Sequence, residues 1–287
     1  MPDLSLHPAQ EGPAAELHAA FGAAFADYLI GPFTLGLDQW PVFLGRQCID
    51  LRLSRVARVG GAIVAFALTA PRPDQPSWRL GTMGALPAAR GSGAAQALLD
   101  DFIARAAAAG QQRVELECFA QNERGLRLYR SRGFEVIDEL HGWQGRPQAL
   151  ADDEAAAVPL DEAFDWLAER AHGLPLQVTP AALRALPAAL AAWRLGGACA
   201  VTSVAADRLT VHSLVDDDVE SQRDALRLLR HLAALHPDCQ LMAPQLMRPR
   251  AGGVALAAAG LERMPLHQLW MRLRLSGRAG PAATSTA

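Results

Sequence analysis

Residues Trp78–Asp100, WRLGTMGALPAARGSGAAQALLD, decide the fold, because they join an apolar run, a glycine-containing turn and a helical repeat. The run Leu80–Leu86 predicts a strand. After the turn Arg90–Ala95, apolar residues recur with a helical period at Leu98, Leu99, Phe102 and Ile103. Glycines in such a turn let the backbone approach a ligand closely, and the first N–H groups of the following helix have no partner within it. The stretch therefore predicts an anion site suited to a pyrophosphate.

The residues after this helix continue an ordered pattern. Gly110 suits the end of the helix, and Val114–Phe119 predicts the next strand. A second helix is expected from Asn122 to Tyr129, NERGLRLY, and after Arg132-Gly133-Phe134 a further strand is expected over Phe134–Leu140. The order strand, R-x-x-G-x-A turn, helix, strand, N-x-x-G-x-x-L-Y helix, G-F, strand resembles the GNAT superfamily of acyl-CoA-dependent N-acyltransferases.

The resemblance covers about the first half of the chain and implies a site for acetyl-CoA. It implies that main-chain groups of the strand pair with the pantetheine arm, with an N–H near Met83 directed at the thioester oxygen. For the Arg90 side chain, contact with phosphate and a solvated surface position both remain open. The cofactor-binding residues expected in this way are Met83, Ala85, Leu86, Arg90, Gly91, Ser92, Gly93, Ala94, Ala95 and Asn122.

Tyr129 is the expected general acid. A phenol of unperturbed pKa about 10 can give a proton to a departing thiolate whose conjugate acid is near 8.5. The alternative is a core tyrosine beside Leu126 and Leu128 on an amphipathic helix. Asn122 has two compatible roles, since the family often uses this position for the cofactor arm and asparagine is also a good N-cap.

Glu117 is the expected base, because an amine of pKa about 10 must lose a proton before it can attack. Glu115 and Glu117 alternate with apolar residues, so both carboxylates face one side of the strand. Burial and like charge raise carboxylate pKa values toward a useful range. The alternative is a structural pairing of Glu117 with Arg113 or Arg79.

The acceptor pocket is expected over the Gly/Pro-punctuated loop Leu29–Leu37 and a short helix at Gln39–Gln47 with Asp38 as its N-cap. Asp27 and Tyr28 are the expected substrate-binding residues, Asp27 drawing in a cationic amine, although capping or surface roles are equally open. Phe21, Phe25, Asp27, Tyr28 and Pro32 also resemble the first-helix region of one bacterial GNAT subgroup. The acceptor itself is expected to be a small-molecule amine that the sequence does not specify.

The composition sets outer limits. A chain of 287 residues, 51% of them hydrophobic, is long enough for two domains. A net charge of −3 gives no reason to expect nucleic acid or an anionic membrane as partner. Four widely spaced cysteines predict free thiols in the cytoplasm, and neither they nor the histidines form a metal-ligand pattern. No run approaches the roughly 20 apolar residues that span a bilayer.

The second half repeats the order of the first. Further elements are expected at Leu4–His7, Pro13–Tyr28, Leu51–Arg58, Ala62–Leu68, Leu160–Ala171, Ala191–Ala205, Leu209–Val215, Glu220–Leu235 and Cys239–Leu246. An ungapped alignment sets Gly260-Leu261 against Gly133-Phe134, Leu256 against Tyr129 and Gly252 against Gly125. At the pyrophosphate position stands Asp216-Asp217-Asp218-Val219-Glu220, whose carboxylates would repel a diphosphate. This half is therefore expected to have lost its cofactor site.

The prediction is an α/β protein of two tandem GNAT-like domains, each a mixed, mostly antiparallel central sheet flanked by helices. The boundaries expected are 1–144 for the catalytic domain, 145–158 for a linker, 159–275 for the degenerate domain and 276–287 for a disordered tail. The expected activity is acetyl-CoA-dependent acetylation of an amine by direct transfer in a ternary complex, without a metal. Two alternatives remain, a non-catalytic acyl-CoA-binding regulator and a tandem transferase that uses aminoacyl-tRNA; a homodimer is also open.

Overall fold

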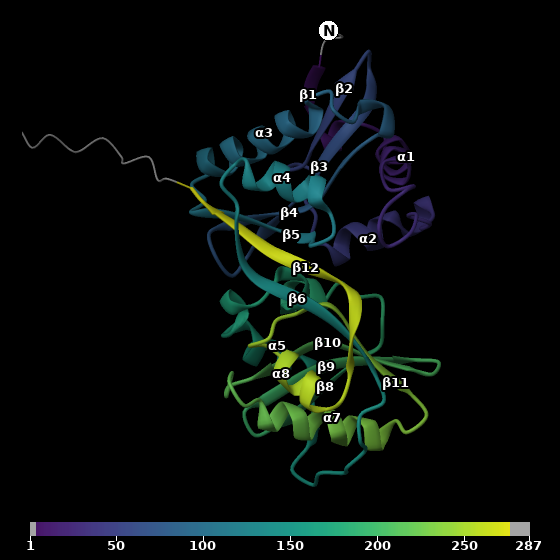
Figure 1. Cartoon of the computed structure of the whole chain (residues 1–287), viewed down its shortest axis with the longest axis vertical. Coiled ribbons are helices and arrows are strands. Elements are labelled where there is room, and N and C mark those ends of the chain that lie inside the picture. Colours follow the sequence, from purple (N-terminus) through teal and green to yellow (C-terminus); the bar gives the residue numbers. More distant parts are fainter. Residues whose placement is uncertain (1–3, 276–287) are drawn as a thin grey trace, which may run out of the picture.

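A computed structural model describes residues 4–275 (Figure 1). The disordered tail expected at 276–287 lies outside these residues. The first half contains β1 (Leu4–Pro8), α1 (Ala14–Ala24), α2 (Trp40–Arg46), β2 (Arg55–Val59), β3 (Ala62–Arg72), β4 (Ser77–Ala85), α3 (Ala94–Ala108), β5 (Arg113–Phe119), α4 (Glu123–Arg130) and β6 (Glu135–Gly145).

The second half repeats this order of strands and helices. It contains β7 (Ala156–Val158), α5 (Leu160–Ala168), α6 (Pro180–Leu183), β8 (Leu190–Leu195), β9 (Ala198–Ala205), β10 (Arg208–Asp216), α7 (Arg223–Leu235), β11 (Gln240–Met247), α8 (Gly253–Ala258) and β12 (Glu262–Arg274). The predicted fold class, α/β with helices flanking a mixed and mostly antiparallel sheet, is confirmed. The range 145–158 expected as linker includes β7, which pairs with β8.

The two halves share one continuous sheet of 12 strands in the order β1-β2-β3-β4-β5-β12-β6-β11-β10-β9-β8-β7. The last strand of each half pairs with the other half's sheet: β12 lies antiparallel to β5, from Gln268 opposite Phe119 to Arg274 opposite Arg113, and β6 lies antiparallel to β11. β6 and β12 also pair with each other, and Figure 1 shows them crossing the centre of the molecule side by side. Each half therefore needs the other to complete its sheet.

Residues that the ungapped alignment of the two halves sets against each other have the same backbone hydrogen bonds and φ angles. The N–H of Phe134 donates to the Tyr129 carbonyl at 3.2 Å, and the N–H of Leu261 donates to the Leu256 carbonyl at the same distance. Both preceding glycines, Gly133 and Gly260, have positive φ, 83° and 82°. The same offset pairs Glu117 with Pro244, so the carboxylate expected to act as base has no counterpart in the second half.

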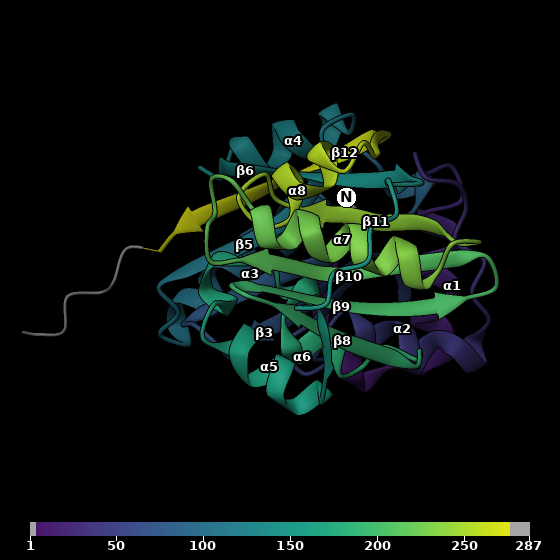
Figure 2. The same cartoon turned by 90° about the horizontal axis from the view of Figure 1, so that it is seen from below.

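Helices cover both halves of the sheet. α3 buries Leu98, Leu99 and Phe102 completely against the first half. α1 and α2 form a second core with β2 and β3, in which Phe21 contacts Trp40 and stacks on Phe66. α7 packs across the strands of the second half, where Figure 2 shows it in front of β9 and β10. No helix within residues 4–275 has both the length and the apolar character needed to span a membrane.

Three sequence expectations are wrong in detail. Asp38 is not the N-cap of α2, because it lies in a preceding 3-10 turn at Leu37–Gln39 and no side chain caps that helix. The expected strand at Leu51–Arg58 begins only at Arg55, since Asp50 holds a turn by accepting the N–H of Arg52. The expected strand at 191–205 is the hairpin of β8 and β9, because Gly196 takes a φ of 51° and reverses the chain.

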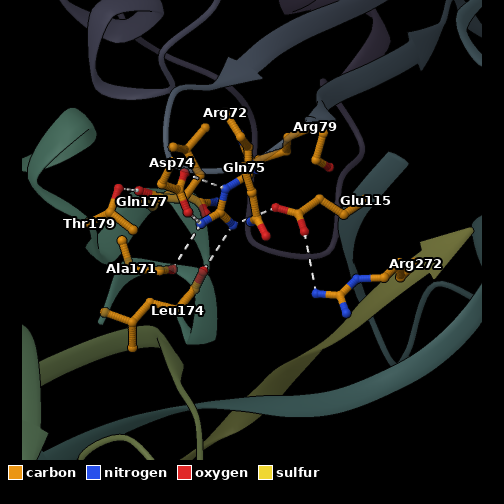
Figure 3. A network of polar contacts seen from close by, with 12 residues as sticks. Arg72, Asp74, Gln75, Arg79, Glu115, Ala171, Leu174, Gln177, Thr179 and Arg272 are labelled. Carbon is orange, nitrogen blue, oxygen red and sulfur yellow. Dashed lines mark hydrogen bonds and ion pairs between the residues drawn. The ribbon is translucent and has the colours of Figure 1, made fainter. Parts of the chain in front are cut away.

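A buried arginine fastens the second half to the first (Figure 3). The guanidinium of Arg72, at the end of β3, donates to Glu115 Oε1 at 2.6 Å and to both oxygens of Asp74 at 3.0 and 2.7 Å. It also donates to the carbonyls of Ala171 and Leu174 in the second half at 3.1 and 2.9 Å. All five N–H donors of Arg72 are thereby used.

Candidate active site

The site begins where β4 and β5 separate. The two strands pair in parallel from Ser77 opposite Arg113 to Leu80 opposite Leu116, and the described residues show no further pairing between them. On its other side β4 stays paired with β3, but with a register shift that makes Gly81 an extra residue. Because a bulge bends its strand, β4 turns away from β5 at this point. Met83 and Ala85 line an opening at this edge of β4.

The turn after β4 has an open form. Gly91 and Gly93 have φ of 87° and 90°, a conformation that other residues rarely adopt. A Cβ on Gly91 would meet nothing within 4 Å, and one on Gly93 would meet only the Gln96 side chain at 3.9 Å. α3 starts at Ala94 with Gly93 as its N-cap and without a capping side chain. The first turn of α3 thus offers N–H groups and the positive end of its dipole to an anion.

A cavity of about 910 Å³ lies between this turn, β4 and α4. Its lining includes most of the residues predicted from the sequence: Met83, Ala85, Arg90, Gly91, Gly93, Ala95, Asn122, Tyr129, Asp27 and Tyr28. Three predicted cofactor-binding residues do not line it. Leu86 packs against the core of α1 and α2, and Ala94 is buried as the first residue of α3. The Ser92 hydroxyl accepts the N–H of Ala94 at 3.3 Å. Their contribution to a ligand would have to come from the main chain.

Arg90 and Asp27 form an ion pair at the rim of this cavity. Two guanidinium nitrogens of Arg90 donate to the two carboxylate oxygens of Asp27, both at 2.6 Å. The hydrogen bond from Arg90 lowers the pKa of Asp27. The sequence analysis assigned these two residues to different ligands, and the structure instead brings them together at the wall of the first cavity.

A second cavity of about 780 Å³ lies between the two halves of the chain. The first half contributes residues of the loop after α1, the end of α2, β4 and β5, in agreement with the expected acceptor region. The second half contributes Gln177, Leu186, Thr210, His212, Met242, Pro244, Gln245, Leu246 and Gln268. The two cavities share Phe25, Tyr28, Met83, Asn122 and Tyr129. These five residues mark where a ligand in one cavity would meet a ligand in the other.

Tyr129 on α4 stands at this junction. The residue is 9% exposed and lines both cavities. Burial raises the pKa of Tyr129, so the phenol is protonated throughout the neutral range and available as a donor. Asn122 lies beside it and caps α4, since its side-chain oxygen accepts the N–H of Gly125 at 3.0 Å.

Glu117 on β5 lies in the second cavity and not in the first. Its Oε2 accepts from Arg79 Nε at 2.7 Å and from Gln177 Nε2 at 3.3 Å, while its Oε1 is buried without a partner. The pairing with Arg79, weighed from the sequence, therefore exists and still leaves one oxygen free. Glu115 faces the same side but points to Arg72, and burial is the main cause of its raised pKa.

Two further groups line the second cavity. Burial raises the pKa of the Cys118 thiol to about 12, which keeps it protonated and a weak nucleophile at neutral pH. Burial lowers the pKa of His212 to about 4, so its imidazole is neutral, and its Nε2 lies 2.7 Å from the Ser203 hydroxyl. The described residues contain no group of three or more His, Cys, Asp or Glu side chains that could hold a metal ion.

The corresponding turn of the second half is closed by its own side chains. Asp216, at the end of β10 and nearly fully buried, accepts the N–H of Ala225 in the first turn of α7 at 2.8 Å. Gln222, the N-cap residue of α7, accepts the N–H of Ala255 on α8 at 3.0 Å and donates to the Pro249 carbonyl at 2.7 Å. A carboxylate thus occupies the helix terminus, and an amide bridges α7 and α8 where the first half has its cavity.

The comparisons with known proteins agree with this architecture. Residues 20–134 match the model of the acetyltransferase (GNAT) family, and this matched part of the chain contains the glycine turn and Tyr129. No curated protein matches the chain significantly.

Solved structures resemble the whole chain. A tandem GNAT protein from the clavulanic acid biosynthesis pathway aligns with a TM-score of 0.59 and 15% identity over 98% of this chain and 100% of that one. A GCN5-related N-acetyltransferase from Sphaerobacter thermophilus aligns with a TM-score of 0.64 and 15% identity over 94% and 95%. One from Anabaena variabilis aligns with a TM-score of 0.67 and 15% identity over 94% and 72%. Identities this low show a shared fold, which here includes the tandem arrangement.

Sequence reasoning missed Gln177 and His212 as lining residues of the second cavity. Both come from the second half, and neither belongs to a motif. Their neighbours in sequence are ordinary turn and strand residues, so no local signal marks them.

Proposed function

We propose that this protein is an acetyl-CoA-dependent N-acetyltransferase that acts on a small-molecule amine by direct transfer in a ternary complex. One observation carries the proposal: a cavity at an uncapped helix N-terminus meets a second cavity at Tyr129 and Met83. The first suits a cofactor with a pyrophosphate and an extended arm. The second has room for a small acceptor.

The first cavity fits acetyl-CoA by its chemistry. The positive-φ glycines leave the turn open, the N-terminal N–H groups of α3 suit a pyrophosphate, and the unpaired edge of β4 suits the amide groups of a pantetheine arm. When bound, acetyl-CoA supplies the acetyl group as an activated thioester. A main-chain N–H near Met83 would stabilise the negative charge that develops on the thioester oxygen.

The proton transfers are assigned to two side chains. Glu117, through its free Oε1, takes a proton from the acceptor amine directly or through one water, and the amine nitrogen then bonds to the carbonyl carbon. As the carbon–sulfur bond breaks, the electron pair goes to sulfur and the Tyr129 hydroxyl supplies the proton of the product thiol. The second proton that the nitrogen loses on becoming an amide restores the Tyr129 hydroxyl. The thiol of Cys118 stays protonated at neutral pH, which supports direct transfer over an acyl-cysteine intermediate.

The second half is proposed to bind no cofactor. Asp216 takes the place of an anion at the start of α7, and Gln222 holds α7 and α8 together. We therefore expect one molecule of acetyl-CoA per chain.

Titration calorimetry with acetyl-CoA tests the assignment. Gly93→Glu and Ala95→Glu each place a carboxylate in the first cavity, and Ala95 is a helical residue whose substitution needs no positive φ. We expect one equivalent bound by the unchanged protein and none by either variant. Gly110→Glu is the matched control, since Gly110 also has positive φ and open space but lies at the other end of α3. Two equivalents, or binding unaffected by both carboxylates, would contradict the proposal.

Activity is measured as thiol release from acetyl-CoA across a panel of amines. Tyr129→Phe should retain cofactor binding and lose most of the amine-dependent release, because it removes only the hydroxyl. Tight binding without turnover on any amine would favour the regulator. Transfer that depends on aminoacyl-tRNA would favour the third alternative.

A further inference from the structure

Two buried oxygen atoms in the second cavity have no hydrogen-bond partner among residues 4–275. One is Glu117 Oε1, on a side chain that is only 1% exposed, and the other is Gln177 Oε1. Glu117 belongs to β5 of the first half, whereas Gln177 belongs to a 3-10 turn of the second half, Leu176–Val178. Both residues line the cavity that we assign to the acceptor.

The two nearest side-chain donors bind the other oxygen of the Glu117 carboxylate. Arg79 Nε and Gln177 Nε2 both donate to Glu117 Oε2, at 2.7 and 3.3 Å, which leaves Oε1 without a donor. The turn that carries Gln177 is held by the Thr179 hydroxyl, which donates to the Leu176 carbonyl at 2.7 Å. A hydrogen bond within its turn therefore holds Gln177 in place. Its amide nitrogen donates to Glu117, and its amide oxygen accepts no hydrogen bond from the described residues.

Such atoms call for a ligand. An unsatisfied buried acceptor costs roughly 1 to 3 kcal/mol, and native structures contain few of them. Here two occur on side chains that contact each other. A group that satisfies both must offer at least two N–H or O–H donors, and among amines a primary amine or its ammonium form does so. A tertiary amine or a quaternary ammonium offers too few.

We propose that the acceptor is a primary amine whose nitrogen donates to Glu117 Oε1 and Gln177 Oε1, so that Gln177 of the second half determines acceptor specificity. The inference rests on the proposed function in that it takes the second cavity as the acceptor site. Arg79 balances the charge of Glu117, so recognition depends on N–H donation more than on charge. The aromatic wall of Phe21, Phe33 and Phe43 receives the apolar part of the acceptor.

The test uses n-butylammonium as probe with the whole protein, in the presence and absence of acetyl-CoA. Binding is followed by NMR through the side-chain amide resonance of Gln177. Butyltrimethylammonium has the same charge and chain but no N–H, and it is the control ligand. Gln177→Met removes the amide with little change in size. Gln245→Met is the matched control variant, because Gln245 lines the same cavity and its side-chain oxygen is not a buried orphan.

We expect n-butylammonium to shift the Gln177 resonance and butyltrimethylammonium to leave it unchanged. Gln177→Met should weaken the binding of n-butylammonium about 10-fold, as expected for one hydrogen bond to a charged group, and Gln245→Met should change it less than 2-fold. With any amine that is acetylated, Gln177→Met should raise the KM of the amine and leave the KM of acetyl-CoA unchanged.

Equal binding of the two ammonium ions, absence of binding, or equal effects of the two variants would overturn the inference. Its failure is separable from that of the proposed function. If n-butylammonium binds at Gln177 while acetyl-CoA fails to bind in the calorimeter, the acceptor site stands and the transferase proposal falls. If acetyl-CoA binds and amines are acetylated without any role for Gln177, the transferase proposal stands and the assignment of Gln177 falls.

Discussion

Replacing Arg72 with methionine should destabilise the protein more than any change at its surface ion pairs. The Arg72 and Glu115 side chains are both 0% exposed, and Arg72 uses all five donors. Arg72→Met leaves the Glu115 carboxylate in the interior with only Arg272 nearby, at 3.8 Å. It also removes the donors of the Ala171 and Leu174 carbonyls. Loss of one partner from a buried pair costs about 3 to 5 kcal/mol.

The assay is urea-induced unfolding followed by circular dichroism, from which the free energy of unfolding is obtained. Arg58→Met is the control, because Arg58 also binds both oxygens of a carboxylate, at 2.7 and 2.6 Å, but its partner Glu16 is 34% exposed. A pair of this kind contributes at most about 1 kcal/mol. Adding Glu115→Gln to Arg72→Met should recover part of the loss, because no buried charge then remains.

Similar losses for Arg72→Met and Arg58→Met would refute the reasoning. So would a second substitution at Glu115 that adds its full cost to that of Arg72→Met. Either result would mean that the two halves are held together without this cluster.

Two further predictions concern His212 in the second cavity and the pairing of β12 with the sheet of the first half. Because the pKa of His212 falls from 6.5 to about 4 on folding, the unfolded chain binds more protons between these values, so stability should fall by about 3 kcal/mol as the pH drops from 6.5 to 4. His212→Gln should flatten this part of the unfolding free energy against pH, and an unchanged slope would contradict it. A fragment of residues 1–158 lacks β12 and leaves β5 with an unpaired edge, so it should aggregate in size-exclusion chromatography. A monomeric fragment that binds acetyl-CoA would show that the first half folds alone.

Much of the first half was predictable from local sequence. The turn at Arg90–Ala95 combines glycines with a following helix, and its open form depends on the backbone conformation that glycine allows, so the local sequence was enough to predict it. The strands Ala62–Leu68 and Val114–Phe119 were predictable from their local runs of apolar residues. Errors arose where a side chain or glycine outside any motif ended an element, as at Asp50 and Gly196.

The candidate site was predictable only in part. Tyr129 and the glycine turn line the first cavity as expected, because the spacing of the motif places them on α4 and before α3. The pairing of Arg90 with Asp27 was not expected, since the two residues are far apart in sequence. Taken separately, the charge of Arg90 suits a phosphate and that of Asp27 suits a cationic amine. The role of Asp216 was also not expected. From its charge, the sequence predicted repulsion of a diphosphate, whereas in the structure its carboxylate accepts the N–H of Ala225 at the start of α7.

The fold class, the repeat of two similar halves and the open glycine turn of the first half could all be predicted from the sequence alone. Those features depend on local periodicity, on glycine and on the charge of a few neighbouring residues. Only the tertiary structure decided that β12 inserts beside β5, that Arg72 joins the halves and that Gln177 meets Glu117. An alternating strand can pair with any compatible edge, and a buried carboxylate requires a donor without specifying which one. Those choices depend on which distant segments meet when the chain folds.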